Sequence, residues 1–84
     1  MIKQGSIVKP TAGKAQDRYF VVLSIEGRRA AISDGRKRKM QKPKQKGIVH
    51  LQDTGCQLDL SEVTTNKQLR KALREKGFFR DPSL

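Results

Sequence analysis

The chain has 84 residues and a formal net charge of +11, and only 35% of its residues are hydrophobic. This length fits a single domain. No apolar run approaches the roughly 18 residues of a membrane span, and residues 1–5 lack the apolar stretch of a secretory signal. With one Cys and one His, the chain has neither an internal disulfide nor a Cys/His zinc cluster. We therefore expect a cytoplasmic protein with a small core.

The positive charge is concentrated in two segments. Residues 28–50 carry nine basic side chains and one acid, Asp34, and residues 66–84 carry six basic side chains and two acids. Residues 51–65, in contrast, have three acids and no basic residue. A folded protein with such an excess repels itself unless a polyanion neutralises it. The distribution favours a nucleic acid as the partner over an anionic membrane surface.

The N-terminal third predicts two strands joined by a loop over residues 11–18. Residues 5–9 form the first strand, which Pro10 ends. Residues 19–25 are aromatic or branched apart from Ser24 and form the second. Its apolar side chains fall on both faces, which suits a strand wrapped inside a small barrel. One face carries Tyr19, Val21, Leu23 and Ile25, and the other carries Phe20 and Val22.

The next segment predicts a hairpin and a closing strand. After the turn signal at residues 26–27, residues 28–33 form a third strand with Ala30 and Ile32 facing inward. The Asp-Gly pair that follows predicts a tight type I′ turn, with a returning strand up to Pro43. Residues 47–51 close the set.

Five short strands at this spacing predict a mainly β fold, a small all-β barrel over residues 1–52. Residues 53–65 are expected to be an acidic connector, and residues 66–84 a helix and tail packed on the barrel within one domain.

The C-terminal part predicts an amphipathic helix from an Asn66 cap to Lys76, with Gly77 just beyond it. Leu69, Ala72 and Leu73 form its apolar stripe. Four cations fall on the opposite side: Lys67, Arg70, Lys71 and Arg74. We expect Phe78 and Phe79 to pack back and tether the helix.

The cations indicate an RNA-binding surface. Seven lie within residues 36–46, inside a predicted hairpin, where neighbouring like charges destabilise the fold. Phosphate contacts would offset that repulsion by releasing counterions. A solvated face and, for residues 36–39, a nuclear localisation signal are the competing interpretations. The predicted RNA-binding residues are Lys14, Arg18, Arg28, Arg29, Arg36, Lys37, Arg38, Lys39, Lys42, Lys44, Lys46, His50, Lys67, Arg70, Lys71 and Arg74.

The aromatic residues suggest which feature of the RNA is recognised. Single-strand readers stack bases on exposed aromatic side chains, whereas Tyr19 and Phe20 lie in the most apolar strand as candidate core residues. We therefore expect recognition of the backbone and shape of structured RNA.

Catalysis is not expected. His50 is the only histidine, Cys56 has no evident activating partner, and no phosphate-binding glycine motif is present. We predict a non-enzyme without cofactor, metal or small-molecule substrate, monomeric when free.

Residues 5–9, 12–14 and 19–23 together resemble a KOW motif. The later segments 34–38, 42–46 and 50–51 resemble the large-subunit ribosomal proteins of the 14e/6e/27e group and their small bacterial KOW-domain relatives. The resemblance covers about residues 4–52, and it implies an SH3-like barrel that binds ribosomal RNA.

The resemblance also implies contacts from the loop over residues 13–18. Asp17 departs from the family pattern, which has a second glycine there, and its carboxylate weakens the approach of a phosphate. Because KOW barrels also occur in transcription elongation factors, a protein-interaction module of a transcription or translation complex is the alternative.

Overall fold

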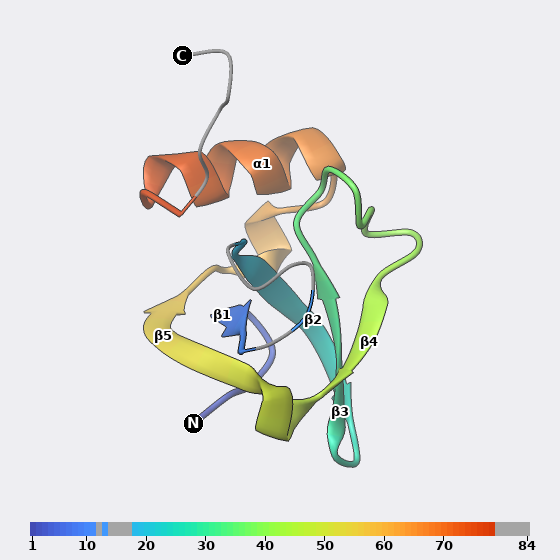
Figure 1. The fold of residues 1–84 in the computed structure, drawn as a ribbon. Coiled ribbons are helices and arrows are strands. Elements are labelled where there is room, and N and C mark those ends of the chain that lie inside the picture. Colours follow the sequence, from blue (N-terminus) through green and yellow to red (C-terminus); the bar gives the residue numbers. More distant parts are fainter. Residues whose placement is uncertain (12, 14–17, 79–84) are drawn as a thin grey trace.

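The structure, a computed structural model, describes residues 1–11, 13 and 18–78, which form one antiparallel sheet and a C-terminal helix (Figure 1). The strands follow the order β4-β3-β2-β1-β5 across the sheet. The prediction of a mainly β fold, a small barrel with a C-terminal helix, is confirmed. The elements are β1 (Ser6–Pro10), β2 (Phe20–Glu26), β3 (Arg29–Ser33), β4 (Lys44–Gly47), the 3-10 turn η1 (Ile48–His50), β5 (Leu51–Gln57), the 3-10 turn η2 (Leu60–Glu62) and α1 (Asn66–Glu75).

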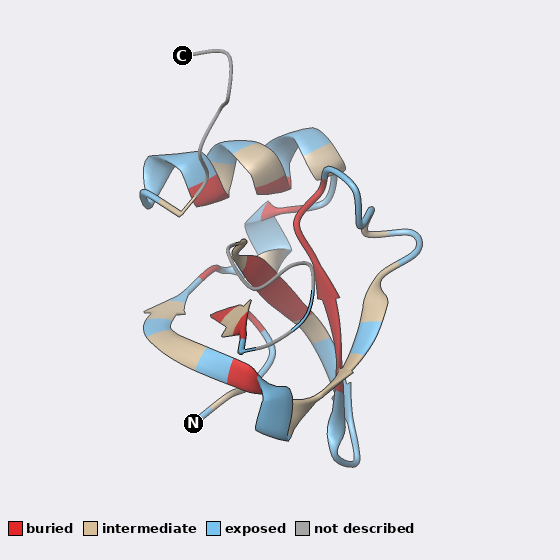
Figure 2. Cartoon of the chain, in the orientation of Figure 1, coloured by how far each residue is buried: buried red, intermediate tan, exposed pale blue. Residues whose placement is uncertain are grey.

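Strands β1 and β2 lie between two hydrophobic clusters, because both of their faces are apolar (Figure 2). The cluster inside the curved sheet is formed by Val8, Phe20, Val22, Ala30, Ile32 and Leu51. The cluster between the sheet and α1 is formed by Ile7, Val21, Leu58, Val63, Leu69 and Leu73. The prediction that β2 is apolar on both faces and that Ala30 and Ile32 point inward is therefore confirmed, and the helix explains the second face.

Irregular pairing bends the sheet. Between Val22 and Ser24 of β2 the register with β3 shifts, and β1 and β5 shift in the same way between Ser6 and Val8. Such bulges increase the local twist of a strand. At the start of β1, the N–H of Gly5 donates to the carbonyl of Val22. A Cβ on Gly5 would lie only 2.6 Å from the carbonyl oxygen of Leu58, so this close approach requires glycine.

The ends of α1 are capped by local sequence. The Thr65 hydroxyl accepts a hydrogen bond from the N–H of Gln68, and the Gln68 side chain accepts one from the Thr65 N–H, a reciprocal capping box. The expected cap at Asn66 is therefore wrong by one residue. At the other end Gly77 has φ +83°, and Phe78 N–H donates to the carbonyl of Leu73 at 2.8 Å. This is a Schellman ending, and it confirms Gly77 as the residue after the cap.

Three expectations about the second half of the sheet are wrong. Residues 47–51 do not form one closing strand, because the turn η1 at residues 48–50 separates the end of β4 from the start of β5. The returning strand does not occupy residues 36–43: β4 begins at Lys44, and its pairing with β3 runs from Ile32↔Lys44 to Arg29↔Gly47. Residues 53–57 are not a connector, because they continue β5 beside β1. Thr54 supports this pairing, since its hydroxyl donates to the carbonyl of Ile7 at 2.7 Å.

Candidate nucleic-acid interface

The segment between β3 and β4, residues 34–43, is a long loop that we call the basic loop. The expected type I′ turn is absent from it, because that turn needs positive φ at two residues and Asp34 has negative φ. The carboxylate of Asp34 is buried instead, with 3% exposure, and its Oδ1 accepts the N–H groups of Arg36 and Arg38 at 3.0 and 3.1 Å. Asp34 thus shapes the loop from within.

A second set of hydrogen bonds gathers on the carbonyl of Arg38. The hydroxyl of Ser33 donates to it at 2.6 Å, and the N–H groups of Asp34 and Gly35 donate to it at 3.2 Å each. The loop base is therefore closed by backbone groups and two short buried side chains. This leaves the long cationic side chains at the surface.

The basic loop packs directly against the start of α1. Gly35 has φ +75°, and a Cβ there would lie 2.8 Å from the carbonyl oxygen of Asn66. Arg70 donates from its guanidinium to the carbonyl of Gly35 at 2.7 Å. The Asn66 side chain accepts from the N–H of Met40 at 2.8 Å and donates to Gln41 at 2.9 Å. Hydrogen bonds from α1 therefore reach the loop both at its start, at Gly35, and near its end, at Met40 and Gln41.

This junction brings the two predicted basic segments together. Five cations of the loop are exposed, namely Arg36, Lys37, Arg38, Lys39 and Lys42. Lys67 and Arg70 project from the first two turns of α1 beside them, and Lys67 is exposed while Arg70 is half-buried. The basic loop and the start of α1 thus form one cationic surface, and hydrogen bonds from Asn66 and Arg70 hold the loop in place.

Lys44 and Lys46 extend this surface down β4. They pair with Ile32 and Ala30, whose side chains lie inside the barrel, so both lysines sit half-buried on the inner side of an edge strand. A Cβ on Gly13 would lie 3.9 Å from the Lys46 ammonium, so Gly13 lies beside this lysine.

Arg18 has an internal partner. Its guanidinium pairs with the buried carboxylate of Asp34 and lies 5.2 Å from the centre of the Phe20 ring. About a third of the side chain, 35%, stays exposed. Arg18 therefore anchors the basic loop to β2, and only its outer edge is open to a ligand. Lys14 and Asp17, which the sequence analysis also considered, lie outside the described residues.

The remaining predicted residues lie elsewhere. Arg28 and Arg29 are exposed at the β2–β3 turn, at the other end of the β3–β4 ribbon from the basic loop (Figure 1). His50 is exposed as well, but it ends the turn η1 and is not in a strand as expected. Its carbonyl accepts two hydrogen bonds from Thr11, which tie η1 to the end of β1.

The C-terminal half of α1 borders acidic residues. Lys71 lies 4.0 Å from Glu75, and Arg74 is exposed in the last turn of the helix. Three carboxylates line a shallow pocket of about 470 Å³ at this end: Asp59, Glu62 and Glu75. The pKa of Asp59 is lowered by hydrogen bonds from Ser61, so this carboxylate is charged at neutral pH. These carboxylates offset the cations Lys71, Arg74 and Lys76 at this end of α1, so it attracts a polyanion less than the basic loop does.

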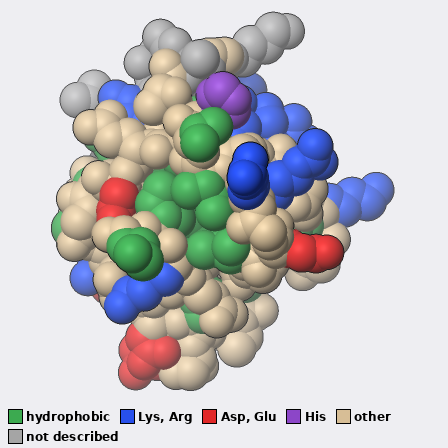
Figure 3. Space-filling model, turned by 90° about the horizontal axis from the view of Figure 1, so that it is seen from below, with side chains coloured by type: hydrophobic (Ala, Val, Ile, Leu, Met, Phe, Trp, Pro, Cys, Tyr) green, Lys and Arg blue, Asp and Glu red, His purple; other side chains and the backbone are tan. Residues whose placement is uncertain are grey.

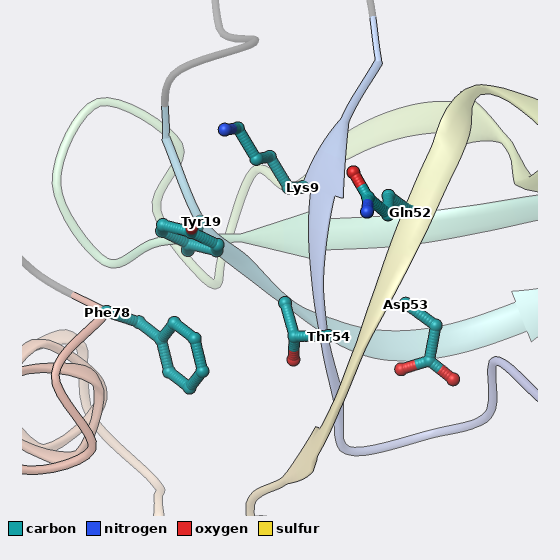
Figure 4. A pocket seen from close by; sticks show the side chains of 6 residues that line it. All are labelled: Lys9, Tyr19, Gln52, Asp53, Thr54 and Phe78. Carbon is teal, nitrogen blue, oxygen red and sulfur yellow. The ribbon is translucent and has the colours of Figure 1, made fainter.

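Two further surface features were missed in the sequence. One is a pocket of about 330 Å³ that lies between Tyr19, Phe78 and side chains of β1 and β5 (Figure 4). The pairs Ile7↔Val21 and Val8↔Phe20 bring the end of β1 to the start of β2, and the Lys9 ammonium lies 5.6 Å from the centre of the Tyr19 ring. The other is an apolar patch at the end of the barrel remote from α1 (Figure 3). Ile25 and Val49 are exposed, by 38% and 84%, and Ile2 and Ile48 are half-buried against the inner cluster.

Within residues 1–11, 13 and 18–78, no helix has the length and apolarity needed to span a bilayer. The same part of the chain holds no group of three or more His, Cys, Asp or Glu side chains arranged for a metal ion. No protein-family model and no curated protein matches this chain.

Proposed function

We propose that this protein binds structured RNA through the basic loop and the first turns of α1. The observation that carries the proposal is that the loop is held by Asp34, Asn66 and Arg70 while its cations face outward. A flexible cationic tail would lose much conformational entropy on binding. A fixed array has already lost most of it, which favours recognition of a backbone of defined shape.

The ligand is proposed to be ribosomal RNA of the large subunit, which makes the protein a cytoplasmic ribosomal protein or ribosome-associated factor. The resemblance of residues 4–52 to KOW ribosomal proteins supports this choice, as does the agreement between the expected small barrel and the observed fold. Sedimentation of a cell lysate tests it. We expect the protein to travel with the large subunit or its precursor, and a protein that stays at the top of the gradient contradicts the ribosomal assignment.

The direct binding test compares two pairs of lysines. Lys37→Gln with Lys39→Gln removes two exposed loop charges, and Lys3→Gln with Lys76→Gln removes two exposed charges away from the loop. Binding to purified large-subunit ribosomal RNA is measured from low to moderate salt. Each lost phosphate contact lowers the salt slope by about 0.7–0.9, so we expect the loop pair to lower it by about 1.5 and the control pair to change it little. Equal slopes for both pairs would place the interface elsewhere.

The apolar patch favours a second candidate function, a protein-interaction module of a transcription or translation complex. Exposed apolar patches commonly mark protein contacts, and Val49 in this patch is 84% exposed. Binding to a protein through this patch would change little with salt and would be lost in Val49→Asp. Binding to RNA through the basic loop shows the opposite behaviour in both tests.

A further inference from the structure

The pocket beside Tyr19 and Phe78 combines aromatic, cationic and amide groups at the surface. It measures about 330 Å³ and is lined by Lys9, Tyr19, Gln52, Asp53, Thr54 and Phe78 (Figure 4). This volume is at the small end of the range for ligand pockets, about 300–1,000 Å³. The pocket is therefore suited to a ligand with a single flat ring system and not to a chain of several units.

The aromatic wall of the pocket consists of two rings in contact. The centres of the Tyr19 and Phe78 rings lie 4.9 Å apart, with 52° between their planes. Both side chains are half-buried, whereas Phe20 next to Tyr19 is fully buried. The expectation that Tyr19 serves only as core is thus incomplete, because part of the pair is open to a stacking partner.

The position of Phe78 is fixed by the backbone. Its N–H donates to the carbonyl of Leu73 in the Schellman ending of α1, and its ring packs against the cluster between sheet and helix. An aromatic platform that is already ordered loses little entropy when a ring stacks on it.

The polar wall of the pocket supplies complementary groups. The ammonium of Lys9 lies over the Tyr19 ring, 5.6 Å from its centre, so it places a positive charge beside the aromatic pair. Gln52, which pairs with Lys9 across β1 and β5, is exposed and carries both a donor and an acceptor in its amide. A carboxamide of this kind can pair with two atoms of an adenine edge.

Asp53 lines the side of the pocket away from the rings, and its carboxylate already has two partners within the protein. Its carboxylate accepts the N–H of Gly55 at 2.9 Å and lies 3.4 Å from the N-terminal ammonium. The hydrogen bond from Gly55 lowers its pKa and keeps it charged. A phosphate is therefore directed to the Lys9 side, and the base to the rings.

We propose that this pocket binds one unpaired nucleobase that is turned out of a structured RNA. The inference rests on the proposed RNA binding and deepens it, because it assigns base recognition to Tyr19, Phe78 and Gln52 while the basic loop contacts phosphates. Arg18 connects the two sites, since it is the chain neighbour of Tyr19 and pairs with Asp34 of the loop. Unpaired RNA bases are commonly read by aromatic stacking together with hydrogen bonds to the base edge.

The test uses three RNA hairpins of one sequence: fully paired, with a single bulged adenosine, and with an abasic site at the bulge. Stacking of one base on an aromatic side chain contributes enough for a roughly tenfold change in affinity. We expect the adenosine bulge to bind about tenfold more tightly than the abasic bulge. Equal affinity for these two hairpins overturns the proposal.

Two variants separate the pocket from the loop. Phe78→Leu keeps an apolar contact with α1 but removes the ring, so it should abolish the preference for the adenosine bulge and leave the affinity for the paired hairpin unchanged. The pair Lys37→Gln with Lys39→Gln should weaken binding of all three hairpins and keep the preference. A Phe78→Leu protein that remains folded by thermal unfolding and retains the preference also overturns the proposal.

A titration with free adenosine monophosphate tests the pocket independently of RNA binding. It is the deciding experiment if none of the hairpins binds, in which case the proposed function fails. Amide NMR signals are then followed during its titration. Shifts at the Gln52 side chain that are absent in Phe78→Leu would support a site for the same base and phosphate chemistry in a free nucleotide. No shift at Gln52 overturns the site altogether.

Discussion

The two connections of β3 begin with almost the same dipeptide and form different structures. Glu26-Gly27 leads into a tight turn, in which Glu26 pairs directly with Arg29. Asp34-Gly35 opens the ten-residue basic loop. Both glycines have positive φ, +61° and +75°. The difference lies in the acid: Glu26 is exposed, whereas Asp34 is buried and bonded to the loop backbone.

The environment of the carboxylate therefore decides which structure forms. An exposed carboxylate before glycine allows a tight turn, whereas a buried one binds the backbone of a longer loop. Arg18 supplies that environment from 16 residues away. Substitutions of Gly35, Asp34 and Arg70, each with a matched control, should separate the contributions of the glycine, the carboxylate and the contact with α1.

Gly35→Ala should have the largest effect. An alanine there adopts left-handed backbone, at about 1–2 kcal/mol, and its Cβ meets the Asn66 carbonyl 2.8 Å away. We expect the free energy of unfolding to fall by about 3 kcal/mol, measured by urea denaturation. Gly27→Ala is the control, because it has a similar φ with nothing within 4 Å of its Cβ, and it should cost about 1 kcal/mol. Equal losses of stability in the two variants would contradict the expectation, because they would mean that the close contact between Gly35 and α1 adds nothing to the backbone strain.

Asp34→Ala should have the next largest effect. It removes the acceptor for two loop N–H groups and leaves the Arg18 guanidinium without its buried partner. Unsatisfied buried groups cost about 1–3 kcal/mol, so we expect a loss of about 2 kcal/mol and faster hydrogen exchange at Arg36 and Arg38. Glu26→Ala at the equivalent position of the turn should change stability by less than about 0.5 kcal/mol. Unchanged exchange in the loop would contradict its role as organiser.

Arg70→Met should have the smallest of the three effects. It retains the apolar stem of the side chain and removes the hydrogen bond to the Gly35 carbonyl. Such a bond contributes about 1 kcal/mol, and thermal unfolding should detect its loss as a shift of a few degrees. Lys67→Met, one turn earlier on the exposed side, serves as the control. If both variants unfold at the same temperature, the loop does not depend on this contact.

Much of the fold could be predicted from local sequence. β1 and β2 have runs of branched or aromatic residues, and β3 follows a turn signal with Ala30 and Ile32 on one face. The helix α1 has its Leu69–Ala72–Leu73 stripe and the glycine after its end. These features act over a few residues, where propensity and periodicity are informative. The Thr65 cap was missed because Asn66 is an equally good capping residue on its own. The signal that favours Thr65 was present in the sequence, since Gln68 three residues later completes a capping-box pattern.

The errors arose where distant residues decide the structure. The Asp-Gly pair predicts a tight turn unless a cation such as Arg18 draws the carboxylate inward. Residues 53–57 read as acidic connector, yet they pair with β1 around a bulge at Gly55, φ +84°. The basic residues themselves were visible in the sequence. That Arg18 and Arg70 hold the loop in place while Lys37 and Lys39 remain exposed could not be read from composition.

The position of β4 has a consequence for how copies of the chain meet one another. β4 is an edge strand, with unpaired backbone groups on its outer side that could recruit a strand from another molecule. Lys44 and Lys46 put two positive charges on this four-residue strand, and edge lysines of this kind discourage such pairing. Charge on β4 therefore protects the protein against edge-to-edge aggregation. A chain with Gln at both positions should be the first to form intermolecular sheet at high concentration, whereas the same changes in the basic loop should not.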